Sequence, residues 1–119
     1  MTAQLFVYGT LVPDGKWYDV VARYVLDHHP ARVAGRLYDT GRGYPAATFT
    51  ADAHDTEVAG YVLTLTDPER ALELLDRFEG EEYERVEVRT TDGTVAVSYQ
   101  WRGERAGLRT IASGRWPIS

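Results

Sequence analysis

Near its amino end the chain reads Gln4-Leu5-Phe6-Val7-Tyr8-Gly9-Thr10-Leu11. A short run of consecutive apolar, β-branched and aromatic residues that stops at a glycine is typical of a buried strand ending in a turn. We therefore predict a first strand over residues 4–8 and a turn at Gly9-Thr10.

Further strands follow from the same kind of pattern. We expect them over residues 32–38, 58–65, 85–89 and 95–101, the last with Val95, Val97, Tyr99 and Trp101 on one face. Gly35 marks a bulge or a close approach within the strand expected over 32–38. Polar turns are expected at 52–55 and 91–94, and a loop at 41–47, where two glycines and a proline surround Tyr44.

Two helices are predicted from apolar spacing and end signals. The first rests on residues that share one helical face, namely Trp17, Val20, Val21, Tyr24 and Val25. It should stop before Pro30. The second should begin with Asp67 as a side-chain cap and Pro68 in the first turn, and end at Gly80.

The length and order of these elements predict the fold class. A chain of 119 residues fits a single domain over 1–119. About six short strands and two helices, segregated rather than alternating, predict an α+β fold. The sheet should be antiparallel or mixed, and a small β-barrel flanked by the two α-helices is the expected form.

Composition excludes several classes of chemistry and of partner. The chain has no cysteine, three histidines at uninformative spacing and a single lysine, Lys16, so thiolate and metal chemistry are not expected and no cofactor is predicted. A net charge of −5 is the wrong sign for nucleic-acid binding. No stretch approaches the ~20 apolar residues of a membrane span. We expect a cytoplasmic protein.

Glu79 stands out because it breaks a local rule. It occupies the last turn of the second predicted helix, where the negative end of the helix dipole disfavours a carboxylate by ~0.3–1 kcal/mol. Violations of local preference concentrate at functional sites, although most surface glutamates have no specific role.

Several segments together resemble one known family. They are Leu5-Phe6-Val7-Tyr8-Gly9-Thr10-Leu11, Gly43-Tyr44-Pro45-Ala46, Leu75-Asp76-Arg77-Phe78-Glu79-Gly80 followed by Tyr83-Glu84-Arg85, and Ala96-Val97-Ser98-Tyr99. In their order and spacing they are similar to the gamma-glutamylcyclotransferase-like family, especially its gamma-glutamylamine cyclotransferase branch. The resemblance covers most of the chain through about Trp101.

The resemblance implies an activity and a set of site residues. It implies a small β-barrel, a substrate-holding loop formed by Tyr8, Gly9, Thr10 and Leu11, and Glu79 as the single catalytic carboxylate. The implied reaction closes the 5-oxoproline ring of a gamma-glutamyl amine through the substrate's own α-amino group. Glu79 would act as the general acid and base, and no cysteine, serine nucleophile or metal is needed.

Other interpretations stay open at this point. Tyr44, Tyr83 and Tyr99 are candidates to line the pocket, but core packing is the better interpretation for at least one of them. A non-catalytic protein that binds 5-oxoproline or a gamma-glutamyl metabolite would use the same residues. A glycosidase would need a second acid, for which Asp76 is the nearby candidate, although a solvent-facing Asp76 is the simpler reading. The amine part of the substrate and the oligomeric state are left open.

Overall fold

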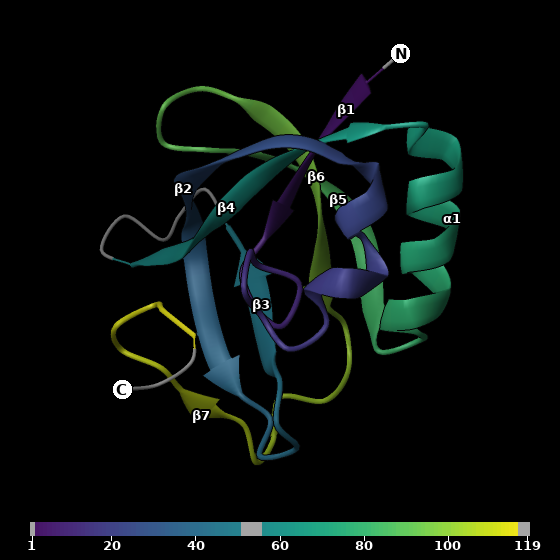
Figure 1. Ribbon diagram of the computed structural model, residues 1–119. Helices are drawn as coiled ribbons and strands as arrows, with labels where there is room; N and C mark the ends of the chain where they lie inside the picture. Colours follow the sequence, from purple (N-terminus) through teal and green to yellow (C-terminus); the bar gives the residue numbers. More distant parts are fainter. Residues whose placement is uncertain (1, 51–55, 117–119) are drawn as a thin grey trace.

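The computed structural model describes residues 2–50 and 56–116 (Figure 1). The predicted turn at 52–55 lies outside them. The elements in chain order are β1 (Thr2–Val7), the 3-10 turns η1 (Tyr18–Val20) and η2 (Ala22–Tyr24), β2 (Val25–Asp39), β3 (Pro45–Phe49), β4 (Glu57–Thr66), α1 (Pro68–Glu79), β5 (Tyr83–Arg89), β6 (Val95–Trp101) and β7 (Arg109–Thr110).

Six strands form a nearly closed mixed barrel in the order β3-β2-β4-β1-β6-β5. The β1–β6 pair is parallel, and the other neighbours on this path are antiparallel. β3 meets β6 across the end of the path, where the Phe49 amide donates to Gln100 Oε1 at 2.8 Å. The predicted α+β barrel is therefore confirmed, and β1 lies between β4 and β6.

Two apolar clusters explain why β1 has no polar face. Phe6 and Tyr8 join a cluster drawn from all six barrel strands, which fills the interior. Leu5 and Val7 point the opposite way, into a second cluster that includes Ala71 and Leu75 of α1. β6 is likewise buried on both sides. Val97, Tyr99 and Trp101 belong to the second cluster, whereas on the other face Ala96 joins the interior cluster. Ser98, also on that face, is fully buried and donates to the Phe6 carbonyl at 2.7 Å.

The predicted first helix is absent, and this is the main correction to the fold. Residues 18–24 form two consecutive 3-10 turns, and Val25 already begins β2. A 3-10 turn repeats every three residues, so Val21 and Tyr24 still share a buried face, and the apolar spacing did not separate the two structures. β2 then continues through Pro30, which is tolerated because β4 is the only strand paired with β2 there among the described residues.

β2 is long because it serves two neighbours in succession. It pairs with β4 up to Ala34 and with β3 from Gly35 onward. A side chain at Gly35 would come within 2.4 Å of the Thr48 carbonyl oxygen, which confirms the close approach predicted at this glycine. β3 starts at Pro45, so the loop expected over 41–47 is shorter than predicted at its second end.

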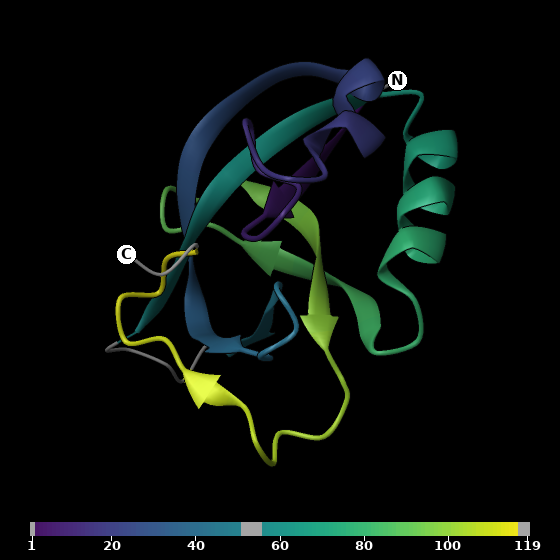
Figure 2. The same ribbon diagram turned by 60° about the horizontal axis from the view of Figure 1, so that its bottom comes forward.

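The second predicted helix is α1, which stands outside the barrel beside β5 (Figures 1 and 2). It begins at Pro68 and is followed by Gly80 at φ 76°, as predicted. Asp67 precedes it, but its backbone is left-handed at φ 48° and its side chain makes no capping hydrogen bond, so the predicted cap is wrong. Glu79 is the last residue of α1.

Candidate functional site

A cavity of about 400 Å³ lies where β1 ends, next to the last turn of α1. Its floor consists of buried residues, namely Phe6, Val7, Tyr8, Leu11, Pro45, Tyr83 and Tyr99. Its rim consists of exposed residues, namely Lys16, Trp17, Arg42, Gly43 and Phe78, together with the partly buried Glu82. The partly buried Gly9, Thr10, Tyr44 and Glu79 also line the cavity. All eight residues proposed from the sequence therefore surround one cavity, while their roles stay predictions.

The loop after β1 offers backbone donors to this cavity. Trp17 N donates to the Thr10 carbonyl at 2.9 Å, which folds the loop back on itself. The amides of Gly9, Thr10 and Leu11 donate to no protein acceptor among the residues that the structure describes. A Cβ at Gly9 would lie 2.8 Å from Pro45 Cγ, so only glycine lets the β3 end pack against this loop. Three free amides around one hollow suit a carboxylate or an oxyanion.

Glu79 is the titratable group whose environment matters most for chemistry. α1 holds its carboxyl partly buried in the cavity wall, and no hydrogen bond or ion pair to it is found in the described part of the chain. Burial raises the pKa of Glu79 from 4.5 to about 7. Such a carboxyl is present in both protonation states near neutral pH, which is what a group that accepts and returns a proton requires.

Three tyrosines form the wall around Glu79, and their hydroxyls are fixed by the protein. Tyr8 donates to the Tyr99 carbonyl and Tyr83 to the Pro45 carbonyl, each at 2.6 Å. Burial, followed by neighbouring charge that includes Glu79, raises the pKa of each phenol. Tyr83 and Tyr99 belong to the core cluster as well as to the cavity wall, so packing and lining are not exclusive here.

Asp76 does not face the cavity as a second acid. Its Oδ1 accepts the Tyr99 hydroxyl at 2.7 Å, and its Oδ2 lies 3.7 Å from Arg85. The side chain is about half exposed, as the solvent-facing interpretation anticipated. Asp76 does not line the cavity, which disfavours a two-carboxylate glycosidase site.

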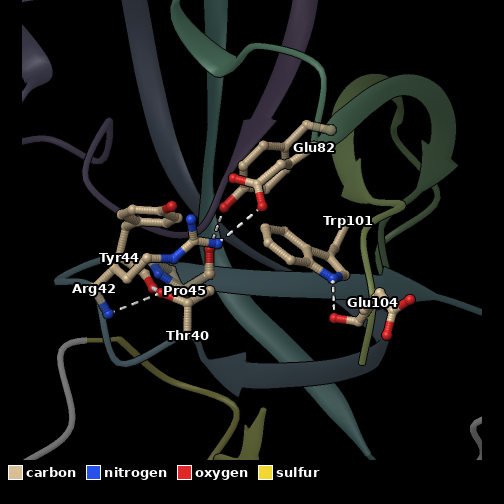
Figure 3. Close-up of polar contacts among 8 residues, drawn as sticks. Thr40, Arg42, Tyr44, Pro45, Glu82, Trp101 and Glu104 are labelled. Carbon is tan, nitrogen blue, oxygen red and sulfur yellow. Dashed lines mark hydrogen bonds and ion pairs between the residues drawn. The ribbon is translucent and has the colours of Figure 1, made fainter. Parts of the chain in front are cut away.

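The charged and aromatic rim is what the sequence analysis missed. Arg42 reaches from the β2–β3 loop to Glu82, with 3.0 Å between Nη2 and Oε2, and its guanidinium stacks over Tyr44 and Trp101 (Figure 3). Trp17 and Phe78 contact each other from the β1 loop and α1. Arg42 lies two residues before the candidate Tyr44, and Phe78 directly precedes Glu79, so their positions in the sequence could have indicated both. No such signal pointed to Lys16, Trp17 or Glu82.

Comparison with known proteins agrees with this geometry. Residues 5–117 match the family model described as gamma-glutamyl cyclotransferase, AIG2-like. The chain belongs to this family. Membership in the AIG2-like gamma-glutamyl cyclotransferases indicates an enzyme of cyclotransferase type, and the family model spans both the β1 loop and Glu79.

Solved structures share the fold. YkqA of Bacillus subtilis superposes with a TM-score of 0.76 at 26% identity over 98% of this chain, which spans only 40% of that protein. The uropathogenic Escherichia coli protein c4763 gives 0.76 at 18% identity, covering 98% of this chain and 93% of that one. At5g39720.1 of Arabidopsis thaliana gives 0.63 at 30% identity, covering 86% and 70%.

Among curated proteins, none matches this sequence. Within the described residues no helix has the length and apolarity to cross a membrane, and no group of three or more His, Asp or Glu side chains is arranged to hold a metal ion.

Proposed function

We propose that this AIG2-like family member releases 5-oxoproline and a free amine from a gamma-glutamyl amine or amide, as the gamma-glutamylamine cyclotransferase branch does. The observation that carries the proposal is the pairing of a carboxyl with a pKa of about 7 and three unpaired backbone amides in one cavity. The first can move a proton at neutral pH, and the second can hold negative charge.

The reaction requires little from the protein beyond these groups. The substrate's α-amino nitrogen attacks its γ-carbonyl carbon, and the new C–N bond closes a five-membered ring. Glu79 takes the proton that the nitrogen loses. The tetrahedral intermediate then collapses, the bond to the leaving amine breaks, and Glu79 returns the proton to that amine. Because the nucleophile is tethered to its target, holding the folded conformation supplies much of the rate.

The β1 loop supports the binding half of the proposal. The amides of Gly9, Thr10 and Leu11 suit either the substrate's α-carboxylate or the oxyanion that develops on the γ-carbonyl oxygen. The Tyr8, Tyr83 and Tyr99 rings shield this end of the cavity from water, which strengthens both interactions. The hydroxyls of Tyr8 and Tyr83 donate to backbone carbonyls. We therefore assign these two residues to positioning their rings, not to transferring the substrate's proton.

The test is 5-oxoproline release from a panel of gamma-glutamyl amines and dipeptides. Glu79→Gln should fold, by circular dichroism, and lose about 10²–10⁴-fold in kcat because it cannot carry the proton. Glu73→Gln is the matched control, since Glu73 lies on α1, is exposed and does not line the cavity. Unchanged turnover by Glu79→Gln rejects the mechanism. Thermal stabilisation by 5-oxoproline without any turnover would instead support a metabolite-binding protein.

A further inference from the structure

The residues that line the cavity are buried at its floor and exposed at its rim. This difference suggests which end of a substrate lies at the floor and which at the rim. In the proposed function the glutamyl part is the same in every substrate and belongs at the β1 loop amides. The leaving amine lies on the other side of the scissile bond from that part. The leaving amine must therefore extend past Glu79 toward the rim. Phe78, which precedes Glu79 in α1, lines the cavity there.

One section of the rim is aromatic. Trp17 is 46% exposed and Phe78 is 39% exposed, although both line the cavity. Their ring centroids are 6.3 Å apart at an interplanar angle of 64°, so they form a joined edge-to-face surface from two different elements. Binding becomes more favourable when a ligand covers large apolar side chains that are exposed at the mouth of a cavity.

The charge on this section is positive. Lys16 Nζ lies 5.4 Å from the centre of the Trp17 ring. No acidic side chain is within ion-pair distance of Lys16 in the described ranges. Arg42, the other cation that lines the cavity, is already paired with Glu82. Lys16 is therefore the cation that remains available to an anion, and it repels a second ammonium group.

We propose, on the basis of the function proposed above, that the preferred leaving amine has an aromatic or large apolar body and carries a carboxylate. The body covers Trp17 and Phe78, and the carboxylate meets the Lys16 ammonium. Gamma-glutamyl derivatives of aromatic amino acids fit this description. Derivatives of polyamines and of small amines do not, because they bring an unpaired cation to Lys16 or leave the aromatic surface uncovered.

Four substrates separate the two contributions. Gamma-glutamyl-phenylalanine has both features, gamma-glutamyl-phenethylamine has the ring alone, gamma-glutamyl-alanine has the carboxylate alone, and gamma-glutamyl-putrescine has neither. We expect kcat/KM for 5-oxoproline release to be highest for the first and lowest for the last. The aromatic contribution should be about tenfold or more and the carboxylate contribution about threefold, the latter falling with added salt.

Variants assign each contribution to its residue. Trp17→Ala should reduce the phenylalanine-to-alanine ratio of kcat/KM, and Lys16→Gln should reduce the phenylalanine-to-phenethylamine ratio. Arg23→Gln is the matched control for the cation. Like Lys16, Arg23 lies over an aromatic ring, with its Cζ 5.0 Å from the centre of the Tyr24 ring, but it does not line the cavity. Leu26→Ala controls for loss of an exposed apolar side chain, since Leu26 is 63% exposed and also lies outside the cavity. Both controls should keep the wild-type ratios.

The outcomes separate this inference from the function on which it rests. If no substrate in the panel releases 5-oxoproline, the proposed function and the inference both fail. If release occurs but putrescine is the best leaving amine, or if neither variant changes its ratio, the function stands and the assignment of Trp17, Phe78 and Lys16 is overturned.

Discussion

Glu79 occupies a position that disfavours a charged carboxylate in two ways. The carboxyl sits at the carboxyl end of α1, where the helix dipole disfavours negative charge, and it is partly buried among Tyr8, Tyr83 and Tyr99. Burial is the dominant cause of its pKa of about 7. A protein under selection for stability alone would place an uncharged residue here, so the position fits a proton-transfer role.

Because the pKa of Glu79 is raised, this residue should make the protein less stable as pH rises, the opposite of a carboxyl whose pKa is lowered by folding. Between pH 4.5 and about 7 the folded state keeps a proton that the unfolded state has released. The contribution of Glu79 to the free energy of unfolding is therefore full below pH 4.5, falls as pH rises and is lost above about 7, a total of about 3 kcal/mol at most. Glu79→Gln does not titrate and should be more stable than wild type at pH 8.

The measurement is urea unfolding of both proteins at several pH values from 4 to 8. The difference in the free energy of unfolding between them should change across this window, whereas Glu73→Gln should follow the wild type throughout. A difference that does not vary with pH would show that Glu79 titrates normally in the folded protein.

At the scale of elements, α1 is tied to the barrel by a polar contact as well as by its apolar face. The Tyr99 hydroxyl of β6 contacts Asp76 Oδ1 at 2.7 Å and the Leu72 carbonyl at 3.5 Å. Arg85 of β5 lies on the other oxygen of Asp76. This contact fixes α1 relative to β5 and β6, and with it the approach of Glu79 to the cavity.

Breaking this contact should weaken both the docking of α1 and the activity. Asp76→Ala leaves the Tyr99 hydroxyl without its carboxylate partner and should lower the free energy of unfolding by about 1–2 kcal/mol. Asp76→Asn keeps an acceptor oxygen and should lose less. In a double-mutant cycle with Tyr99→Phe the coupling should be about 1 kcal/mol, and kcat should fall more than KM rises.

The control for this cycle is Glu73→Ala on the same helix. Among the residues that the structure describes, Glu73 forms an ion pair only with Arg77, at 2.6 Å and in an exposed position, so its loss should change stability by no more than about 0.5 kcal/mol. Additive effects of Asp76→Ala and Tyr99→Phe would mean that the contact does not hold α1 in solution.

At the scale of the whole molecule, the segment after β6 completes the barrel at the end away from α1. β7 pairs with β2, and the Ile111 amide donates to the Leu37 carbonyl at 2.8 Å, which sets the yellow segment beside β2 (Figure 2). The Ala59 amide donates to the Gly114 carbonyl at 2.7 Å. Ile111 joins the interior cluster and is 7% exposed, so this segment belongs to the core.

Ile111→Ala should therefore destabilise the barrel without altering the chemistry. Loss of a buried isoleucine that leaves a cavity costs about 2–4 kcal/mol. The midpoint of thermal unfolding should fall, while kcat for the proposed 5-oxoproline release, measured below both transitions, should match wild type because Ile111 does not line the cavity. Arg109→Ala, an exposed neighbour, should leave the midpoint nearly unchanged. A wild-type midpoint for Ile111→Ala would place the segment outside the cooperative unit.

Patterns that depend on nearby residues were sufficient for much of this fold. The apolar run before Gly9, the Pro68 and Gly80 ends of α1 and the alternation in β5 all predicted their elements, because each reflects backbone geometry within a few residues. The 3-10 turns at 18–24 were missed for the same reason. Residues spaced by three and four satisfy a helix and two short turns alike, and pairing of Val25 with β4 decided between them.

Motifs were enough to name the cavity-wall residues that belong to them, above all the Tyr8-Gly9-Thr10-Leu11 loop and Glu79. Folding brings Lys16, Trp17 and Glu82 to the same cavity, and it pairs Asp76 with Tyr99 instead of leaving it in the cavity wall. It also decided the pKa of Glu79. Burial and charge pairing depend on side chains that the barrel brings together from distant parts of the chain, and no local pattern records that distance.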